Sequence, residues 1–336
     1  MKTLFSILSL ALMLCSCTIE VPSKPNSNGK TCEILVVCDK SEFATATGDT
    51  LRAFFMQHRT TLNQMEPLFS LANVPMSAFD KSDMFKHMRN TILIVFNPEK
   101  PAQFLVKQDA WASNQIVFQF TAPNKQEFFK LFQEKRELML KAFYDKERTR
   151  IINTFKVSEN VEISDRLQKT FGFKLVFPEG FIIRTANPDF MSINKETKDY
   201  GQNVMVCTYP YTANSFKQEN ILKMRNQIAQ QYIFGPAEGS YMTTEMALPP
   251  ISAELNLNGR YAIETRGLWK LEGDFMGGPF VNYVFLDEEK NQIVMIDAFL
   301  YSPKKPKRDL LMQLESIAYS IKELKIENGK ALSEVK

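Results

Sequence analysis

From residue 33 onward, short apolar runs alternate with segments of helical spacing. The runs 33–39 (EILVVCD), 91–96 (TILIVF) and 115–120 (QIVFQF) have the length and β-branched content of buried strands. The charged segment 125–150 has helical periodicity instead, and its predicted apolar face carries Phe128, Leu131, Leu138 and Ala142. This alternation predicts an α/β domain.

The second half follows a different order. A short helix beginning near Val161 precedes several strands, and a helix over 218–233 precedes longer strands over 252–271, 280–287 and 291–301. A closing helix is predicted from the apolar positions Leu310, Leu314, Ile317, Ile321 and Leu324. The pattern predicts an antiparallel sheet flanked by helices, so the whole chain is expected to be α/β (α+β) with two domains.

The N-terminus has the features of a secretory signal. Lys2 is followed by the apolar run Leu4–Leu14, which is too short to span a bilayer as a helix. The run ends in Leu14-Cys15-Ser16-Cys17, which resembles a bacterial lipobox and implies cleavage before Cys17 and lipidation of that cysteine. An ordinary secreted protein is the alternative.

These features divide the chain into five segments. They are a signal peptide at 1–16, a flexible linker at 17–30, an N-terminal domain at 31–157, a C-terminal domain at 158–326 and a tail at 327–336. The lipid on Cys17 would hold the protein to a membrane. Thr18 stands where an inner-membrane retention aspartate would be, and Glu20 is the one nearby acid. We therefore expect an outer-membrane lipoprotein facing the periplasm, with cell-surface exposure as a second possibility.

The net charge limits the class of ligand, and the cysteine spacing limits the possible disulfides. The formal net charge of +3 is too small to indicate nucleic-acid binding. Cys32, Cys38 and Cys207 remain after processing. Cys32 and Cys38 lie too far apart along one predicted strand for a disulfide, which leaves free thiols or a bridge to Cys207.

No motif for catalysis, metal or cofactor binding is apparent. The histidines His58 and His87 lack partners at metal-ligand spacing, and no phosphate-binding glycine motif follows a strand. We therefore assign no catalytic residue, no metal and no cofactor.

The strongest candidate for a binding site is the segment 266–280, RGLWKLEGDFMGGPF. Its glycines are expected to allow positive φ on both sides of Phe275 and Met276, which would display two apolar side chains at a hairpin tip. The candidate binding residues are Arg266, Trp269, Asp274, Phe275, Met276, Gly277 and Gly278. The alternative is a tight turn in which the glycines are required only by the geometry of the sheet.

A second candidate is a polar cluster on the predicted sheet. Glu264 and Arg266 fall on one face of a strand, close enough for lateral contact. Asp297 interrupts the apolar strand IVMIDAFLY and needs a basic partner if it is buried, for which Arg266 is our choice.

Several segments also resemble a known family. They are EILVVCDK, PLFSLANVPMSAF, GSYMTTE, ETRGLWKLEGDFMGGPF and YSPKKPKRDLLMQLESI. Together they resemble a domain-of-unknown-function family of lipoproteins from gut-type Gram-negative bacteria, for which no activity is established. The second half is also similar to PsbP-like domains, which implies an α/β/α sandwich.

The combined features favour a cell-envelope lipoprotein acting as a non-catalytic binding or assembly accessory with an envelope protein as partner. One alternative is an envelope-polymer hydrolase that uses Glu264, Asp274 or Asp297 for acid–base chemistry. Another is a small-molecule carrier with a closed apolar cavity.

Overall fold

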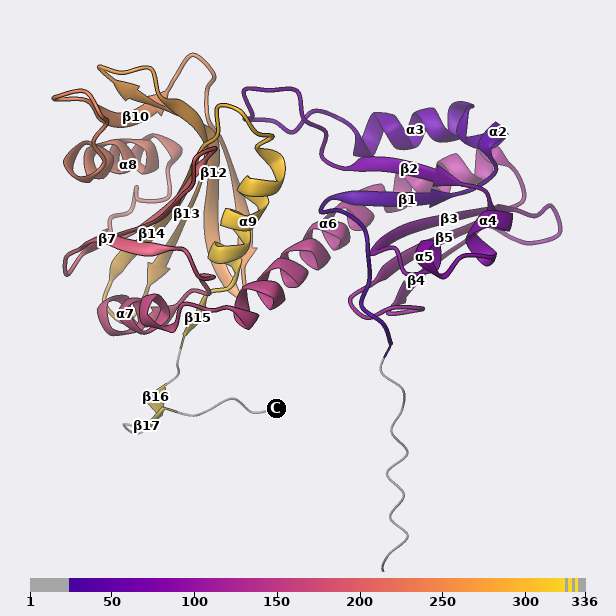
Figure 1. Cartoon of the computed structure of the whole chain (residues 1–336), viewed down its shortest axis with the longest axis horizontal. Helices are drawn as coiled ribbons and strands as arrows, with labels where there is room; N and C mark the ends of the chain where they lie inside the picture. The colour runs from indigo at the N-terminus through magenta and orange to yellow at the C-terminus, as the bar shows by residue number, and fades with distance from the viewer. Residues whose placement is uncertain (1–23, 324–325, 328–329, 332–336) are drawn as a thin grey trace, which may run out of the picture.

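The structure is a computed structural model that describes residues 24–323, 326–327 and 330–331. It has two halves, each built on one main sheet, and the long helix α6 runs from the first half to the second (Figure 1). The predicted signal peptide, Cys17 and Leu324 lie outside the described residues.

The N-terminal half contains a five-stranded sheet in the order β2-β1-β3-β5-β4. All neighbours are parallel except β4, which pairs antiparallel with β5 at one edge. The strands are β1 (Glu33–Val37), β2 (Ser70–Val74), β3 (Asn90–Phe96), β4 (Gln103–Gln108) and β5 (Ile116–Ala122). The helices are α2 (Lys40–Phe43), α3 (Ala46–Phe55), α4 (Met76–Asp80), α5 (Asp83–Lys86) and α6 (Lys125–Val157).

Helices cover both faces of this sheet, because a parallel sheet connected by crossovers is apolar on both sides. An aromatic-rich core lies between the sheet and helices α3 and α6. A smaller core lies on the other face, where Phe79 of α4 packs near Leu35 and Leu93. Cys32 and Cys38 flank β1 and are buried and unpaired, as is Cys207 in the second half.

The C-terminal half contains an eight-stranded antiparallel sheet in the order β10-β12-β13-β14-β9-β8-β7, with β11 also paired to β12. Its strands are β7 (Ile182–Ala186), β8 (Phe190–Glu196), β9 (Gly201–Pro210), β10 (Tyr241–Glu245), β11 (Ile251–Leu257), β12 (Arg260–Glu272), β13 (Gly277–Asp287) and β14 (Gln292–Tyr301). Strands β10 and β11 share one side of β12, since Thr244 pairs with Trp269 and Ala253 pairs with Glu264.

Helices lie on both faces of this sheet, which confirms the predicted α/β/α sandwich (Figure 1). Helix α8 (Gln218–Tyr232) covers one face, and α7 (Val161–Phe171) and α9 (Arg308–Tyr319) cover the other. The remaining strands are short: β6 (Phe173–Lys174) pairs with β15 (Lys322–Glu323), and β16 (Ile326–Glu327) pairs with β17 (Lys330–Ala331).

Two details of the N-terminal half differ from the sequence-based expectation. The buried face of α6 carries Phe128, Phe132, Met139 and Phe143, whereas the expected core residue Leu138 is 52% exposed. Part of the predicted linker is also docked on the first half. Asn26 and Asn28 form β-bridges with Ser113 and Met88, and Lys24 and Pro25 also contact Ser113, so the described part of the linker is bound to the body.

The two halves exchange core residues. Leu62, from the loop after α3, is buried in the core beneath α7 and α9 of the second half. Met312 of α9 is buried in the aromatic core of the first half. Glu66 adds a polar link, because its carboxylate accepts hydrogen bonds from the backbone N–H groups of Lys307 and Arg308 at the start of α9. In the part of the chain that the structure describes, no helix is long and apolar enough to cross a membrane.

Candidate functional site

The predicted binding segment forms the end of β12, a turn and the start of β13. Gly273 has a φ of +84°, a conformation that glycine adopts without strain, and the Asp274 carboxylate accepts a hydrogen bond from the Phe275 N–H at 2.6 Å. The Phe275 side chain is fully exposed, while Met276 packs against the core under α8. The turn therefore displays one apolar side chain rather than the expected two.

Gly277 and Gly278 are strand residues, and the expectation of positive φ at both is wrong. A Cβ on Gly278 would lie 2.0 Å from the Leu300 carbonyl oxygen, and one on Gly277 would lie 2.8 Å from the Trp269 carbonyl oxygen. Both glycines are needed because neighbouring strands approach them closely. Trp269 is 4% exposed and donates its indole N–H to the Leu300 carbonyl at 3.1 Å, so its side chain belongs to the core.

A second exposed aromatic lies near this turn and was missed from the sequence. Phe234 is 69% exposed in the loop after α8 and forms a β-bridge with Tyr241. Ser240 connects the two loops: its carbonyl accepts from the Gly235 N–H at 3.1 Å, and its Cβ lies 3.6 Å from the Cβ position of Gly273. We call the exposed pair Phe234 and Phe275 the tip patch.

The lateral contact between Glu264 and Arg266 is present. The Arg266 guanidinium donates to both carboxylate oxygens of Glu264, at 2.6 and 2.8 Å. Arg266 also donates to Glu315 of α9 at 2.7 Å, and Arg59 of the N-terminal half donates to the same Glu315 oxygen. The predicted pair is therefore one side of an ionic network between the two halves.

The network and its burial shift the pKa values of Glu315 and Tyr283. Burial alone would raise the pKa of Glu315, but the guanidinium groups of Arg266 and Arg59 lower it to about 2. Burial raises the pKa of the neighbouring Tyr283, and the charges of Glu264 and Glu315 raise it further. Glu315 is therefore an anion at neutral pH that neutralises arginines from both halves, which is a structural role.

Asp297 has a different partner from the one expected. Its carboxylate accepts from the Arg225 guanidinium at 2.7 and 3.3 Å and from the Asn282 side chain at 2.9 Å. The predicted Arg266 partner is wrong. Arg225 also donates to Thr244 at 3.1 Å and stacks 3.8 Å from the centroid of the Phe280 ring.

The three carboxylates proposed for acid–base catalysis do not converge. Asp297 points to the α8 side of the sheet, Glu264 points to the α9 side, and Asp274 lies at the turn beyond both. The two strand carboxylates are each held by an arginine at hydrogen-bond distance. No single cleft brings two of these groups to one substrate.

Two surface depressions lie away from these carboxylates. A shallow depression of about 480 Å³ lies between α7 and β7, and a smaller one of about 190 Å³ lies between the end of β9 and α8. Neither is lined by a candidate residue. The described ranges contain no group of three or more His, Cys, Asp or Glu residues placed to hold a metal ion.

Comparisons with solved structures give only distant likenesses. A mutant of the protein Mog1 is 11% identical, with a TM-score of 0.31, and the Saccharomyces cerevisiae Ran-binding protein Mog1p is 12% identical, with a TM-score of 0.28. Each match covers 45% of this chain and 90% of the other. A Bacteroides thetaiotaomicron VPI-5482 protein is 7% identical over 47% of each chain, with a TM-score of 0.27. These scores carry no argument about function.

Family comparisons are more informative. No curated protein matches the chain. Residues 27–156 match the family model of a domain of unknown function, DUF8532, and residues 160–320 match that of another, DUF4837. Two successive segments of the chain thus each match a domain of unknown function, and the two matches support its place in an uncharacterised family.

Proposed function

We propose that this protein is a lipid-anchored cell-envelope lipoprotein of a gut-type Gram-negative bacterium, acting as a non-catalytic binding or assembly accessory. The anchor is the lipid on Cys17, at the outer membrane and facing the periplasm, after removal of the signal peptide. The tip patch is its contact surface for an envelope protein.

The observation that carries this proposal is the full exposure of Phe275, together with the exposed Phe234 on a loop that Ser240 links to the same turn. A single exposed apolar side chain is common on protein surfaces, but aromatic residues are enriched at protein contacts. The ion pairing of Glu264 and Asp297 supports a binding role over the hydrolase alternative, because an arginine of this chain occupies each carboxylate.

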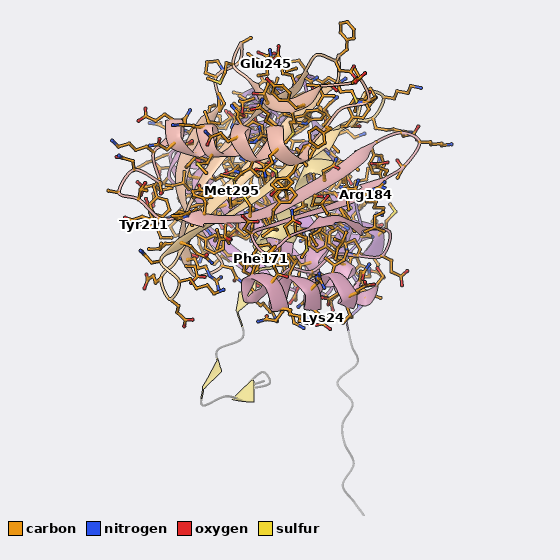
Figure 2. The ribbon with its side chains drawn as sticks, turned by 90° about the vertical axis from the view of Figure 1, so that its left-hand side faces the viewer. Lys24, Phe171, Arg184, Tyr211, Glu245 and Met295 are labelled. Atoms are coloured by element: carbon orange, nitrogen blue, oxygen red, sulfur yellow. The ribbon has the colours of Figure 1, made fainter. Side chains whose placement is uncertain are left out.

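The place where the described residues begin supports this role. Residues Pro25 and Lys24 contact the N-terminal half at Ser113 and Asp109, where the chain leaves the body. Figure 2 places Lys24 at one end of the molecule and Glu245, at the end of β10, at the opposite end. The segment from Cys17 to Lys24 reaches roughly 25 Å when extended. A lipid on Cys17 would therefore tether the protein by the end at which Lys24 lies, opposite the end that carries Glu245.

The test is crosslinking in living cells, followed by affinity purification of the tagged lipoprotein and mass spectrometry. Three proteins are compared: wild type, the double variant Phe234→Ala/Phe275→Ala, and the control Val157→Ala. Val157 is a highly exposed apolar residue at the end of α6, so its variant removes exposed apolar surface elsewhere.

One envelope protein recovered with wild type and Val157→Ala, but lost with the double variant, is the expected result. Equal recovery from all three would exclude the tip patch as the contact surface. The anchor is tested separately by metabolic labelling with an alkyne fatty acid, which we expect to label wild type and not Cys17→Ala. Labelling of both proteins would exclude Cys17 as the lipid site.

A further inference from the structure

The large sheet of the C-terminal half has two edges. They differ in how well their backbone groups are protected from pairing with another strand. One edge is β7, and part of the other is β11, which pairs with β12 on one side. An edge strand presents unpaired backbone N–H and C=O groups that accept another strand unless the edge is protected.

The β7 edge is protected. Its register against β8 shifts between Ile183 and Thr185, which is a bulge, and Arg184 lies at this position. The Arg184 side chain interacts with Asn194 at 3.0 Å and with Glu196 at 3.5 Å. Bulges and charged side chains are the usual means of preventing strand addition at an edge.

The β11 edge has no bulge, and Glu254 is its one charged side chain. Its seven residues pair with β12 in an unbroken register from Ile251 opposite Arg266 to Leu257 opposite Arg260. Among the described residues, no strand pairs with its outer side. Alternate residues of β11 thus direct their backbone donors and acceptors outward, along a straight and regular edge.

One face of β11 carries an apolar stripe. Leu257 is buried in the core under α7 and α9, Leu255 packs partly against it, and Ile251 on the same face is 54% exposed. Leu248, just before the strand, is 55% exposed. The apolar surface of the sheet therefore continues past α9 to the rim, where an added strand would bury it.

The other face of β11 is polar. Ser252 shares a hydrogen bond of 2.8 Å with Thr265 of β12, and Glu254 is exposed and interacts with Tyr261. Glu254 is the one charged residue in β11. A strand paired to this edge would place one of its side chains directly beside this carboxylate.

We propose that β11 accepts an extended segment of a partner protein as an additional antiparallel strand of the sheet. The segment would carry apolar side chains toward the α7/α9 face and a lysine or arginine opposite Glu254. This site lies on the part of β12 remote from the tip patch and depends on neither that patch nor the lipid anchor.

A second copy of the chain is a poorer occupant. If β11 paired with itself along its full length, the two-fold axis would pass through Glu254 and place it opposite its own copy. Like charges directly opposite each other destabilise an antiparallel pair, whereas opposite charges stabilise it. The charge of β11 therefore favours a cationic strand from another protein.

The test uses two synthetic peptides of the length of β11 that alternate valine and threonine and have lysine or glutamate at the centre. Binding is measured by fluorescence anisotropy, and the site is located by hydrogen exchange of the β11 amides in the lipid-free chain. We expect the lysine peptide to protect β11 and to bind wild type roughly threefold to tenfold more tightly than the glutamate peptide.

Two variants make the test specific. Glu254→Lys should reverse the preference, so that the glutamate peptide binds more tightly. The control Glu288→Lys makes the same charge change in the exposed turn after β13 and should keep the wild-type preference. Thermal unfolding confirms that each variant is folded before binding is measured.

Four results would overturn the proposal. The first is that neither peptide protects β11, and the second is that Glu254→Lys keeps the wild-type preference. The third is that the outward-facing β11 amides, those not paired with β12, are already protected in the free monomer, which would mean that the chain covers its own edge. The fourth is a dimer in analytical ultracentrifugation that protects β11, which would identify a second copy as the occupant.

Discussion

Arg59 of the N-terminal half and Glu315 of α9 form an ion pair in which the Glu315 side chain is fully buried. Arg266 of β12 donates to the same carboxylate at 2.7 Å, and Arg148 of α6 lies 3.8 Å from its other oxygen. One carboxylate thus joins α6, α9, β12 and the loop after α3. The network links the two halves through one shared carboxylate.

Replacing the Glu315 carboxylate tests how much this network contributes to stability. We expect Glu315→Gln to lower the free energy of unfolding by about 3–5 kcal/mol, because it leaves arginines in the interface without their anion. Urea denaturation followed by circular dichroism gives this value. The control Glu289→Gln, in an exposed turn, should change stability by less than about 0.5 kcal/mol. Similar values for the two variants would rule out a stabilising role for Glu315.

The same network predicts a pH dependence. Glu315 has a pKa of about 2 in the folded protein, against an ordinary value of 4.5, so its ionised form stabilises the fold. This contribution is fully present above pH 4.5 and is lost as the pH falls toward about 2. The difference in unfolding free energy between wild type and Glu315→Gln should be constant above pH 4.5 and should shrink below it. A difference that stays constant down to the acid limit would contradict this assignment.

The pair Arg225 and Asp297 makes a different prediction, because both side chains are fully buried within one half. Asp297→Ala should cost about 3–5 kcal/mol of stability, since it leaves a buried guanidinium unpaired. The double variant Arg225→Met/Asp297→Ala should cost clearly less than the sum of the two single changes. Additive losses in this double-mutant cycle, measured by chemical denaturation, would show that the two residues do not interact.

A substitution at Gly278 tests whether the glycines of the predicted loop are required by the close approach of neighbouring strands. Gly278→Ala should destabilise the protein by about 1–3 kcal/mol, because the new Cβ collides with the Leu300 carbonyl. Gly201→Ala in β9 is the matched control, since its Cβ would meet nothing closer than 3.6 Å. Differential scanning calorimetry compares the two. Equal melting temperatures would show that β13 moves away from Leu300 at no cost.

Much of the architecture was predictable because it depends on local periodicity. The helix predicted over 218–233 corresponds to α8 (Gln218–Tyr232), and the long strands after it lie close to their predicted positions. The buried face of α6 was not predictable in the same way. Leu138 and Met139 both continue an apolar series at helical spacing, and only the position of the aromatic core decides that Met139 is buried.

The candidate site was harder to predict because its partners are distant in the sequence. Asp297 was correctly expected to need a basic partner, but Arg225 lies in another element and pairs across the sheet–helix interface. One signal was present: Arg225 follows Ile221 by four residues, which places it on the buried face of α8. Arg59 gave no comparable signal, because it lies in a loop without periodicity.

The exchange of Leu62 and Met312 between the two cores has a consequence for dividing this chain. The family matches end at residue 156 and resume at residue 160, which suggests a place to cut. A cut there would remove Met312 from the core of the N-terminal fragment and Leu62 from the core of the C-terminal fragment. Each missing residue lies on the other fragment. Two fragments made separately are therefore complementary parts of one folding unit. Mixing them should restore the complete buried cores that neither fragment has alone.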